Sequence, residues 1–119
     1  MGQNVKVAVI GGGASGVFAA ICAAESSSQA QVDIFEKSQS PLAKVRISGG
    51  GRCNVTHACF DPRELIDHYP RGSQELLGPF HKFCTGDTME WFEDRGVSLT
   101  VEADNRVFPV SNSSETIVD

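Results

Sequence analysis

The sequence has no excess of basic residues, and this absence disfavours several functions. Ten Lys and Arg stand against fifteen Asp and Glu, which gives a formal net charge of −5. Such a chain has no general attraction for phosphate backbones or anionic lipid, so we expect neither a nucleic-acid partner nor a membrane partner. The charge is uneven, however, and the middle of the chain could receive an anion through its five basic residues, Lys44, Arg46, Arg52, Arg63 and Arg71.

Paired cysteines and export signals are also missing. The four cysteines, at positions 22, 53, 59 and 84, include no CxxC pair, so we expect no metal site and no dithiol motif. Reduced thiols are typical of a cytoplasmic protein, which is the localisation we expect. Residues 7–24 carry no charge, but four glycines and a serine interrupt this run, which disfavours a signal peptide.

The length and composition predict one globular domain, and its first forty residues predict a βαβ unit. The chain has 119 residues, of which 40% are apolar and 21% are charged. The β-branched run Val5–Ile10 is typical of a buried parallel strand. Residues 14–25 have the apolar period of a helix, and residues 32–36 form a second strand.

A GxGxxG motif lies at the first junction between strand and helix. Gly11 permits a tight turn, Gly13 lets the backbone approach a pyrophosphate, and Gly16 allows close packing of helix on strand. The first helical residues, Ala14 and Ser15, would direct unpaired N–H groups at the phosphates. The motif therefore predicts a site for a dinucleotide.

Glu36 adds to this prediction because it lies twenty residues after Gly16, at the end of the second strand. There a carboxylate can accept hydrogen bonds from ribose hydroxyls. It would repel a 2′-phosphate, which argues against NADP, but the motif does not separate FAD from NAD. A different nucleoside ligand and a purely structural glycine turn are the alternatives.

A second glycine cluster, Ser48–Asn54, reads Ser-Gly-Gly-Gly-Arg-Cys-Asn. Three consecutive glycines lose much backbone entropy on ordering, which indicates that something flat or anionic approaches the backbone. Successive N–H groups can form an anion nest, to which Arg52 adds a permanent charge. A flexible surface loop is the alternative. Cys53 beside Arg52 could be redox-active, but a packed thiol is the favoured interpretation.

Several segments together resemble the BaiN/YhiN-like family of NAD(P)/FAD-dependent oxidoreductases, which are flavoproteins similar to glutathione reductase. The string ISGGGRCN is the most specific of them, and the likeness spans nearly the whole chain. The segments are Val9–Gly16, Ile34–Lys37, Ile47–Asn54, Tyr69–Gly72, Gly96–Val97 and Arg106–Val110.

This resemblance implies which residues bind FAD. The pyrophosphate would lie on Gly11–Gly16, Glu36 would hold the adenosine ribose, and Lys37 would flank it. Family members have Gly-Arg-Lys where this chain has Leu-Ala-Lys, so Lys44 is the retained cation. A loop would run along the flavin side of the cofactor, and its residues are Gly49, Gly50, Gly51, Arg52, Cys53 and Asn54.

The remaining residues predict helices and a β-hairpin. Asp61 and Pro62 start a helix to about Tyr69. A second helix covers residues 74–83, and a third begins at a capping pair, Asp87 and Glu90. Residues 97–102 and 106–110 form the hairpin. The fold class is therefore α/β, a partial Rossmann-like FAD-binding domain with a βαβ start followed by helices and a β-hairpin.

We expect residues 1–119 to be the N-terminal part of an FAD/NAD(P)-binding domain, because the resembled family is several hundred residues long. The remainder of that domain, the substrate domain and the catalytic residues would then be absent. The first strand would lack a neighbour, and its exposed edge could support self-association.

The predicted parent protein is an FAD-dependent oxidoreductase that takes hydride from NAD(P)H and acts on a small-molecule substrate. We expect residues 1–119 alone to be inactive. The alternatives are a non-catalytic NAD/FAD-sensing module and an RNA-modifying flavoprotein.

Overall fold

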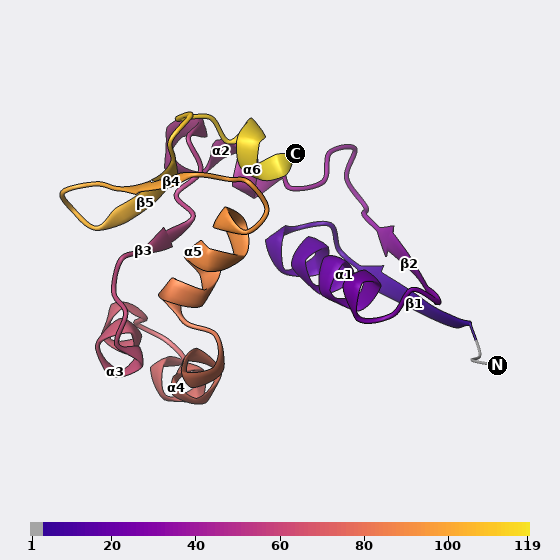
Figure 1. The fold of residues 1–119 in the computed structure, drawn as a ribbon, viewed down its shortest axis with the longest axis horizontal. Coiled ribbons are helices and arrows are strands. Elements are labelled where there is room, and N and C mark those ends of the chain that lie inside the picture. Colours follow the sequence, from indigo (N-terminus) through magenta and orange to yellow (C-terminus); the bar gives the residue numbers. More distant parts are fainter. Residues whose placement is uncertain (1–3) are drawn as a thin grey trace. The chain divides into compact units, whose positions relative to one another are not determined.

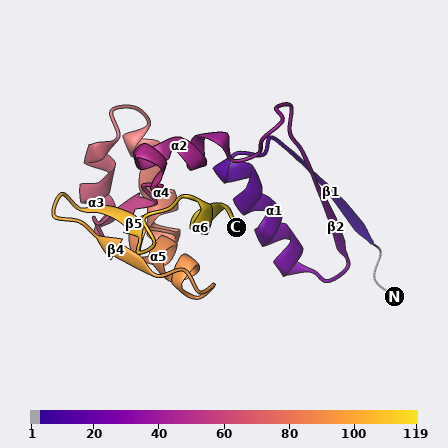
Figure 2. The same cartoon turned by 90° about the horizontal axis from the view of Figure 1, so that it is seen from above.

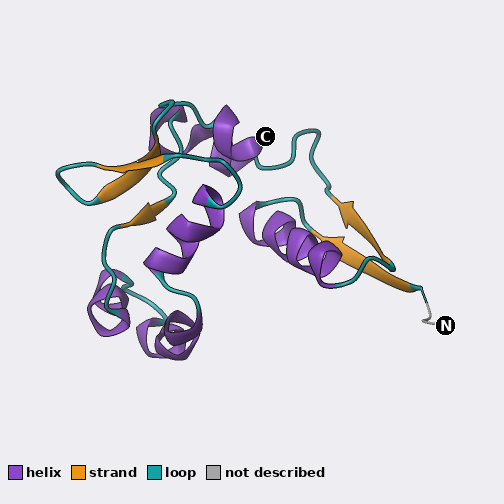
Figure 3. Cartoon of the chain, viewed as in Figure 1, coloured by secondary structure: helices purple, strands orange, loops and turns teal. Residues whose placement is uncertain are grey.

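The computed structural model describes residues 4–119, which form two compact units. The first unit extends to Ile47 and also includes Val118, and the second comprises Ser48–Ile117 with Asp119. Figures 1 and 3 show the elements of both units, and each unit is described by itself below.

The first unit is a βαβ arrangement, as predicted. Strand β1 (Val5–Ile10) pairs in parallel with β2 (Ala30–Phe35), in a register that places Val5 opposite Ala30 and Ile10 opposite Phe35. Helix α1 (Ala14–Ser26) connects them and packs along the sheet, where its Ala20 is buried. Because parallel strands need a crossover connection, α1 returns the chain to the start of β2 (Figure 2).

Helix α2 (Ala43–Gly51) begins in the first unit, but its regular part is short. Ser48, Gly49 and Gly50 have non-helical backbone angles, and Gly49 and Gly50 are in the left-handed region. The second glycine cluster therefore ends the helix. Sequence patterns did not predict this helix.

The second unit packs helices beside a small antiparallel sheet, in which β5 (Arg106–Pro109) lies between β3 (Thr56–His57) and β4 (Leu99–Val101). Its central strand β5 supplies the core, since Val107, Phe108 and Pro109 are fully buried. Strands β4 and β5 pair in antiparallel fashion, which confirms the predicted hairpin. The elements are β3 (Thr56–His57), α3 (Pro62–Leu65), the 3₁₀ helix η1 (Ile66–His68), α4 (Ser73–Lys82), α5 (Thr85–Glu93), β4 (Leu99–Val101), β5 (Arg106–Pro109) and α6 (Glu115–Val118).

Two predictions for this unit were incomplete or wrong. Strand β3 was not predicted, because two residues carry too little pattern. Helix α5 begins at Thr85, ahead of the predicted capping pair. Cys84 is its N-cap, and the Asp87 carboxylate accepts a hydrogen bond from the Cys84 N–H at 2.8 Å. Among the described helices, none combines the length and the apolar character needed to cross a bilayer.

Candidate functional site

The turn between β1 and α1 depends on two glycines. Gly11 has a φ of +101° and donates its N–H to the Phe35 carbonyl oxygen at 2.8 Å, which holds the turn at the end of β2. A Cβ on Gly16 would lie 1.9 Å from the Gly11 carbonyl oxygen. The helix can therefore start this close to the strand only if residue 16 has no side chain.

Helix α1 presents an open amino end beside this turn. Its N-cap is Gly13, which has no side chain to satisfy the first N–H groups, and no acidic residue lies in the first turn. A Cβ built on Gly13 would meet no atom within 4 Å. The space in front of Gly13 is therefore available to a ligand, and the partial positive charge of the helix end favours an anion there.

The Glu36 carboxylate is fixed beside the turn by three donors. Its Oε1 accepts the Gly12 N–H at 2.8 Å, and its Oε2 accepts the Ser38 hydroxyl and N–H, both at 2.6 Å. The Ser38 hydroxyl, followed by the Gly12 and Ser38 N–H groups, lowers the pKa of Glu36 from 4.5 to about 2. Glu36 is therefore ionised at neutral pH, and its oxygens keep lone pairs for further donors.

A pocket of about 510 Å³ joins these features within the first unit, a volume that suits a small ligand. The loop after β2 forms one of its walls, where the Leu42 N–H donates to the Gly12 carbonyl oxygen at 2.7 Å. Leu42 has a φ of +58° at that point. The lining residues are Gly12, Gly13, Ala14, Ser15, Glu36, Ser38, Ser40, Leu42, Ala43, Lys44 and Val45.

The pocket brings together five of the residues that the sequence singled out: Gly13, Ala14, Ser15, Glu36 and Lys44. Gly11 and Gly16 build the turn behind it, and Lys37 is not among the lining residues. Sequence reasoning missed Ser38 and Ser40. A serine two residues after an acid was an available signal, because its hydroxyl and N–H can bond locally to that acid.

The predicted flavin-side loop, Gly49–Asn54, belongs to the second unit. Cys53 is buried with a φ of +61°, and burial raises the pKa of its thiol. The burial of Cys53 agrees with the favoured interpretation of a packed thiol. Among residues 4–119, no group of three or more His, Cys, Asp or Glu side chains could hold a metal ion.

Parallel strands, a glycine turn, an open helix start and an acid at the end of β2 define a Rossmann-type domain, the class that binds nucleotide cofactors. More specifically, residues 5–119 match the model of the HI0933-like protein Rossmann domain family. The match covers nearly the entire sequence, and the chain belongs to this family.

Two characterised relatives are similar to this chain. The 3-dehydro-bile acid delta(4,6)-reductase of Clostridium scindens is 32% identical over 114 residues, which cover 96% of this chain and 27% of the relative. The ribosomal RNA dihydrouridine synthase of Escherichia coli is 26% identical over 117 residues, covering 98% of this chain and 28% of the relative. The chain thus spans just over a quarter of the length of either relative.

Proposed function

We propose that this chain provides the adenosine-diphosphate part of an FAD site in a flavin-dependent oxidoreductase. The observation that carries the proposal is the pocket itself, which combines the open start of α1 with an ionised carboxylate and a lysine. A pyrophosphate linked to a ribose needs donors and positive charge at one end and an acceptor at the other.

The residues of the first unit fit this ligand in distinct ways. The N–H groups at the start of α1 would donate to the phosphate oxygens, and Lys44 would add positive charge. Glu36, held in place by Gly12 and Ser38, would accept hydrogen bonds from the ribose hydroxyls. FAD, when bound, supplies the hydride chemistry of the flavin ring, whereas these residues bind and orient its adenine half.

We infer that the complete enzyme reduces a carbon–carbon double bond with electrons from NAD(P)H. One relative is named a delta(4,6)-reductase and the other a dihydrouridine synthase, and both names describe products richer in hydrogen. A small organic molecule is the favoured substrate, because a net charge of −5 gives no general attraction for RNA. An RNA substrate is the alternative, because the second relative is named for ribosomal RNA.

The test is an absorption spectrum of the full-length gene product, followed by anaerobic titration with NADH and NADPH. We expect a flavin spectrum that either nucleotide bleaches. A colourless protein that binds NAD tightly, and that FAD cannot reconstitute, would contradict the proposal in favour of a sensing module.

A matched pair of variants locates the binding site within the first unit. Gly13→Ala places a methyl group in the open space before α1, so it should weaken FAD binding about tenfold or more, since a ligand phosphate needs that approach. Lys6→Ala removes a charge on β1, in the same unit, that does not line the pocket, and it serves as the control. Equal losses in both variants would argue against the assigned pocket.

An RNA substrate is tested separately, by a mobility-shift assay with ribosomal RNA over a range of salt concentrations. We expect no salt-sensitive binding. Tight binding that weakens steeply with salt would replace the small-molecule substrate by RNA and leave the flavin assignment in place.

A further inference from the structure

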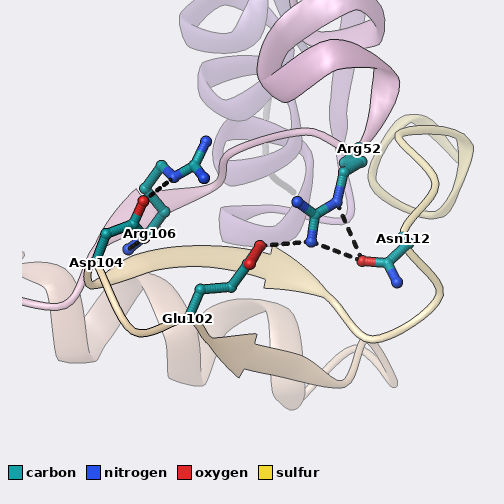
Figure 4. Close-up of polar contacts among 5 residues, drawn as sticks. All are labelled: Arg52, Glu102, Asp104, Arg106 and Asn112. Atoms are coloured by element: carbon teal, nitrogen blue, oxygen red, sulfur yellow. Dashed lines mark hydrogen bonds and ion pairs between the residues drawn. The ribbon is translucent and has the colours of Figure 1, made fainter.

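The Arg52 side chain makes three hydrogen bonds inside the second unit. Its Nη2 donates to Glu102 Oε1 at 2.5 Å and to Asn112 Oδ1 at 2.9 Å, and its Nε donates to the same Asn112 oxygen at 3.2 Å. The guanidinium carbon lies 3.9 Å from the centre of the buried Phe108 ring. Figure 4 shows Arg52 reaching from the glycine-rich loop to Glu102 and Asn112.

The loop that carries Arg52 has two more tethers in the same unit. The Gly51 carbonyl oxygen accepts the Ser114 N–H at 2.9 Å. A Cβ on Gly49 would lie 2.7 Å from Cε1 of Phe108, so the ring packs directly on that backbone. Gly50 and Gly51, in contrast, would place a Cβ in open space. The loop is held at its base and leaves the backbone of Gly50 and Gly51 accessible.

Charge balance separates two roles for Arg52. An anion bound by Arg52 would compete for its charge with Glu102, whose side chain is only 31% exposed. Removing one partner from a half-buried ion pair is costly, because the remaining charge is poorly solvated. As it stands, Glu102 neutralises Arg52, and the guanidinium has little net charge to offer a phosphate.

We propose that Arg52 is a positioning residue that clamps the Gly49–Asn54 loop onto β5 and the turn after it, and that it does not bind the anionic part of the cofactor. Glu102, Asn112 and the face of Phe108 are its partners. The ligand side of the loop is then the backbone of Gly50 and Gly51. The role in cofactor binding rests on the proposed function, whereas the clamp itself does not.

The clamp is tested without cofactor, by hydrogen exchange at the Cys53 and Ser114 amides, which donate to the Ser48 and Gly51 carbonyl oxygens at 3.0 and 2.9 Å. Glu102→Gln and Asn112→Ala should each speed exchange about tenfold, as expected from the loss of a hydrogen bond to a charged group. Asp104→Asn is the matched control, because Asp104 lies on the same hairpin and pairs with Arg106 and not with Arg52 (Figure 4).

The second arm uses FAD affinity and the visible spectrum of the full-length gene product. A lysine at position 52 would keep the positive charge, but it would lose the paired hydrogen bonds to Asn112 and the stacking of the guanidinium on the Phe108 ring. A clamp predicts that Arg52→Lys weakens FAD binding as much as Arg52→Gln does, and that both variants alter the flavin absorption bands at saturating FAD. Unchanged bands in both variants would contradict the role of the clamp in cofactor binding.

Two results would overturn the proposal. One is unchanged exchange at the Cys53 and Ser114 amides in both Glu102→Gln and Asn112→Ala. The other is full FAD affinity in Arg52→Lys with tighter binding in Glu102→Gln, which would make Arg52 an anion ligand that Glu102 restrains. If the wild-type protein binds no flavin, the proposed function fails, and the exchange arm still decides whether the clamp exists.

Discussion

The two glycine clusters occupy different settings, although both look like cofactor loops in the sequence. In the first, Gly16 is required by the Gly11 carbonyl oxygen, and Gly13 faces open space beside a pocket. In the second, Gly49 is required by the Phe108 ring, and Gly50 faces open space. Each cluster thus contains one glycine demanded by packing and another that leaves room. The first cluster leads into the start of helix α1, whereas the second is followed by Arg52, which is bound to Glu102.

The strongest test of this comparison is Gly16→Ala. A methyl group 1.9 Å from the Gly11 oxygen forces the backbone to move, so we expect a loss of about 3 kcal/mol or more in the free energy of unfolding. Without the clash, replacing glycine by alanine inside a helix would raise the free energy of unfolding by up to ~1 kcal/mol. A measured loss would therefore have to come from the contact with the Gly11 oxygen. Urea denaturation measures it.

Gly13→Ala is the control in the same turn. Its φ is −85° and its Cβ would meet no atom within 4 Å, so stability should change by no more than about 1 kcal/mol. If Gly13→Ala unfolds the protein as readily as Gly16→Ala, the two glycines do not have separate roles.

Gly49→Ala should have the next largest effect. The new methyl group would lie 2.7 Å from Phe108 at a φ of +59°, for a loss of about 2 to 3 kcal/mol. Gly50→Ala, at a φ of +69° but in open space, should lose only about 1 kcal/mol. Thermal and urea unfolding of both variants give the comparison.

A double-mutant cycle of Gly49→Ala with Phe108→Leu isolates the contact. Because the smaller side chain relieves the crowding, the double variant should be more stable than the sum of the single changes predicts. Strict additivity would show that the ring does not restrict residue 49.

The Glu36 carboxylate gives a pH-dependent test of the first turn. Its folded pKa of about 2 lies below the usual 4.5, so its hydrogen bonds stabilise the fold fully above about pH 4.5. This stabilisation is lost as the pH falls toward 2. Urea midpoints measured between pH 6 and 2 should fall less steeply in Glu36→Gln than in the wild type.

Ser38→Ala sharpens this experiment, because the Ser38 hydroxyl is the largest cause of the lowered pKa. Its removal should shift the loss of stability to higher pH. Unchanged profiles in both variants would mean that Glu36 does not bind these donors in solution.

The smallest expected effect concerns the edge of β1, which among the described strands pairs with β2 alone. Ile10 on this strand is 81% exposed, and an open apolar edge favours pairing between copies. We expect weak, concentration-dependent association in sedimentation experiments, reduced by Ile10→Lys. Val101→Lys, an exposed position in the second unit, should not change it.

The sequence predicted the first unit better than the second because the first has long, periodic elements. Strand β1, helix α1 and strand β2 follow from the β-branched run, the glycine turn and the helical period. The start of α5 was wrong because Asp87 can act either as an N-cap or as the third helical residue, and local patterns do not separate the two. Ser38 was missed because its role depends on a hydrogen bond to Glu36.

The sequence by itself determined the class of fold and the candidate nucleotide site, because glycine spacing and strand patterns encode local backbone conformations. Only the tertiary structure decided that Glu36 is held by Gly12 and Ser38, and that Arg52 is bound to Glu102 and Asn112. These pairs join residues up to 60 positions apart. Their partners are selected by how the chain packs, and no local pattern records that choice.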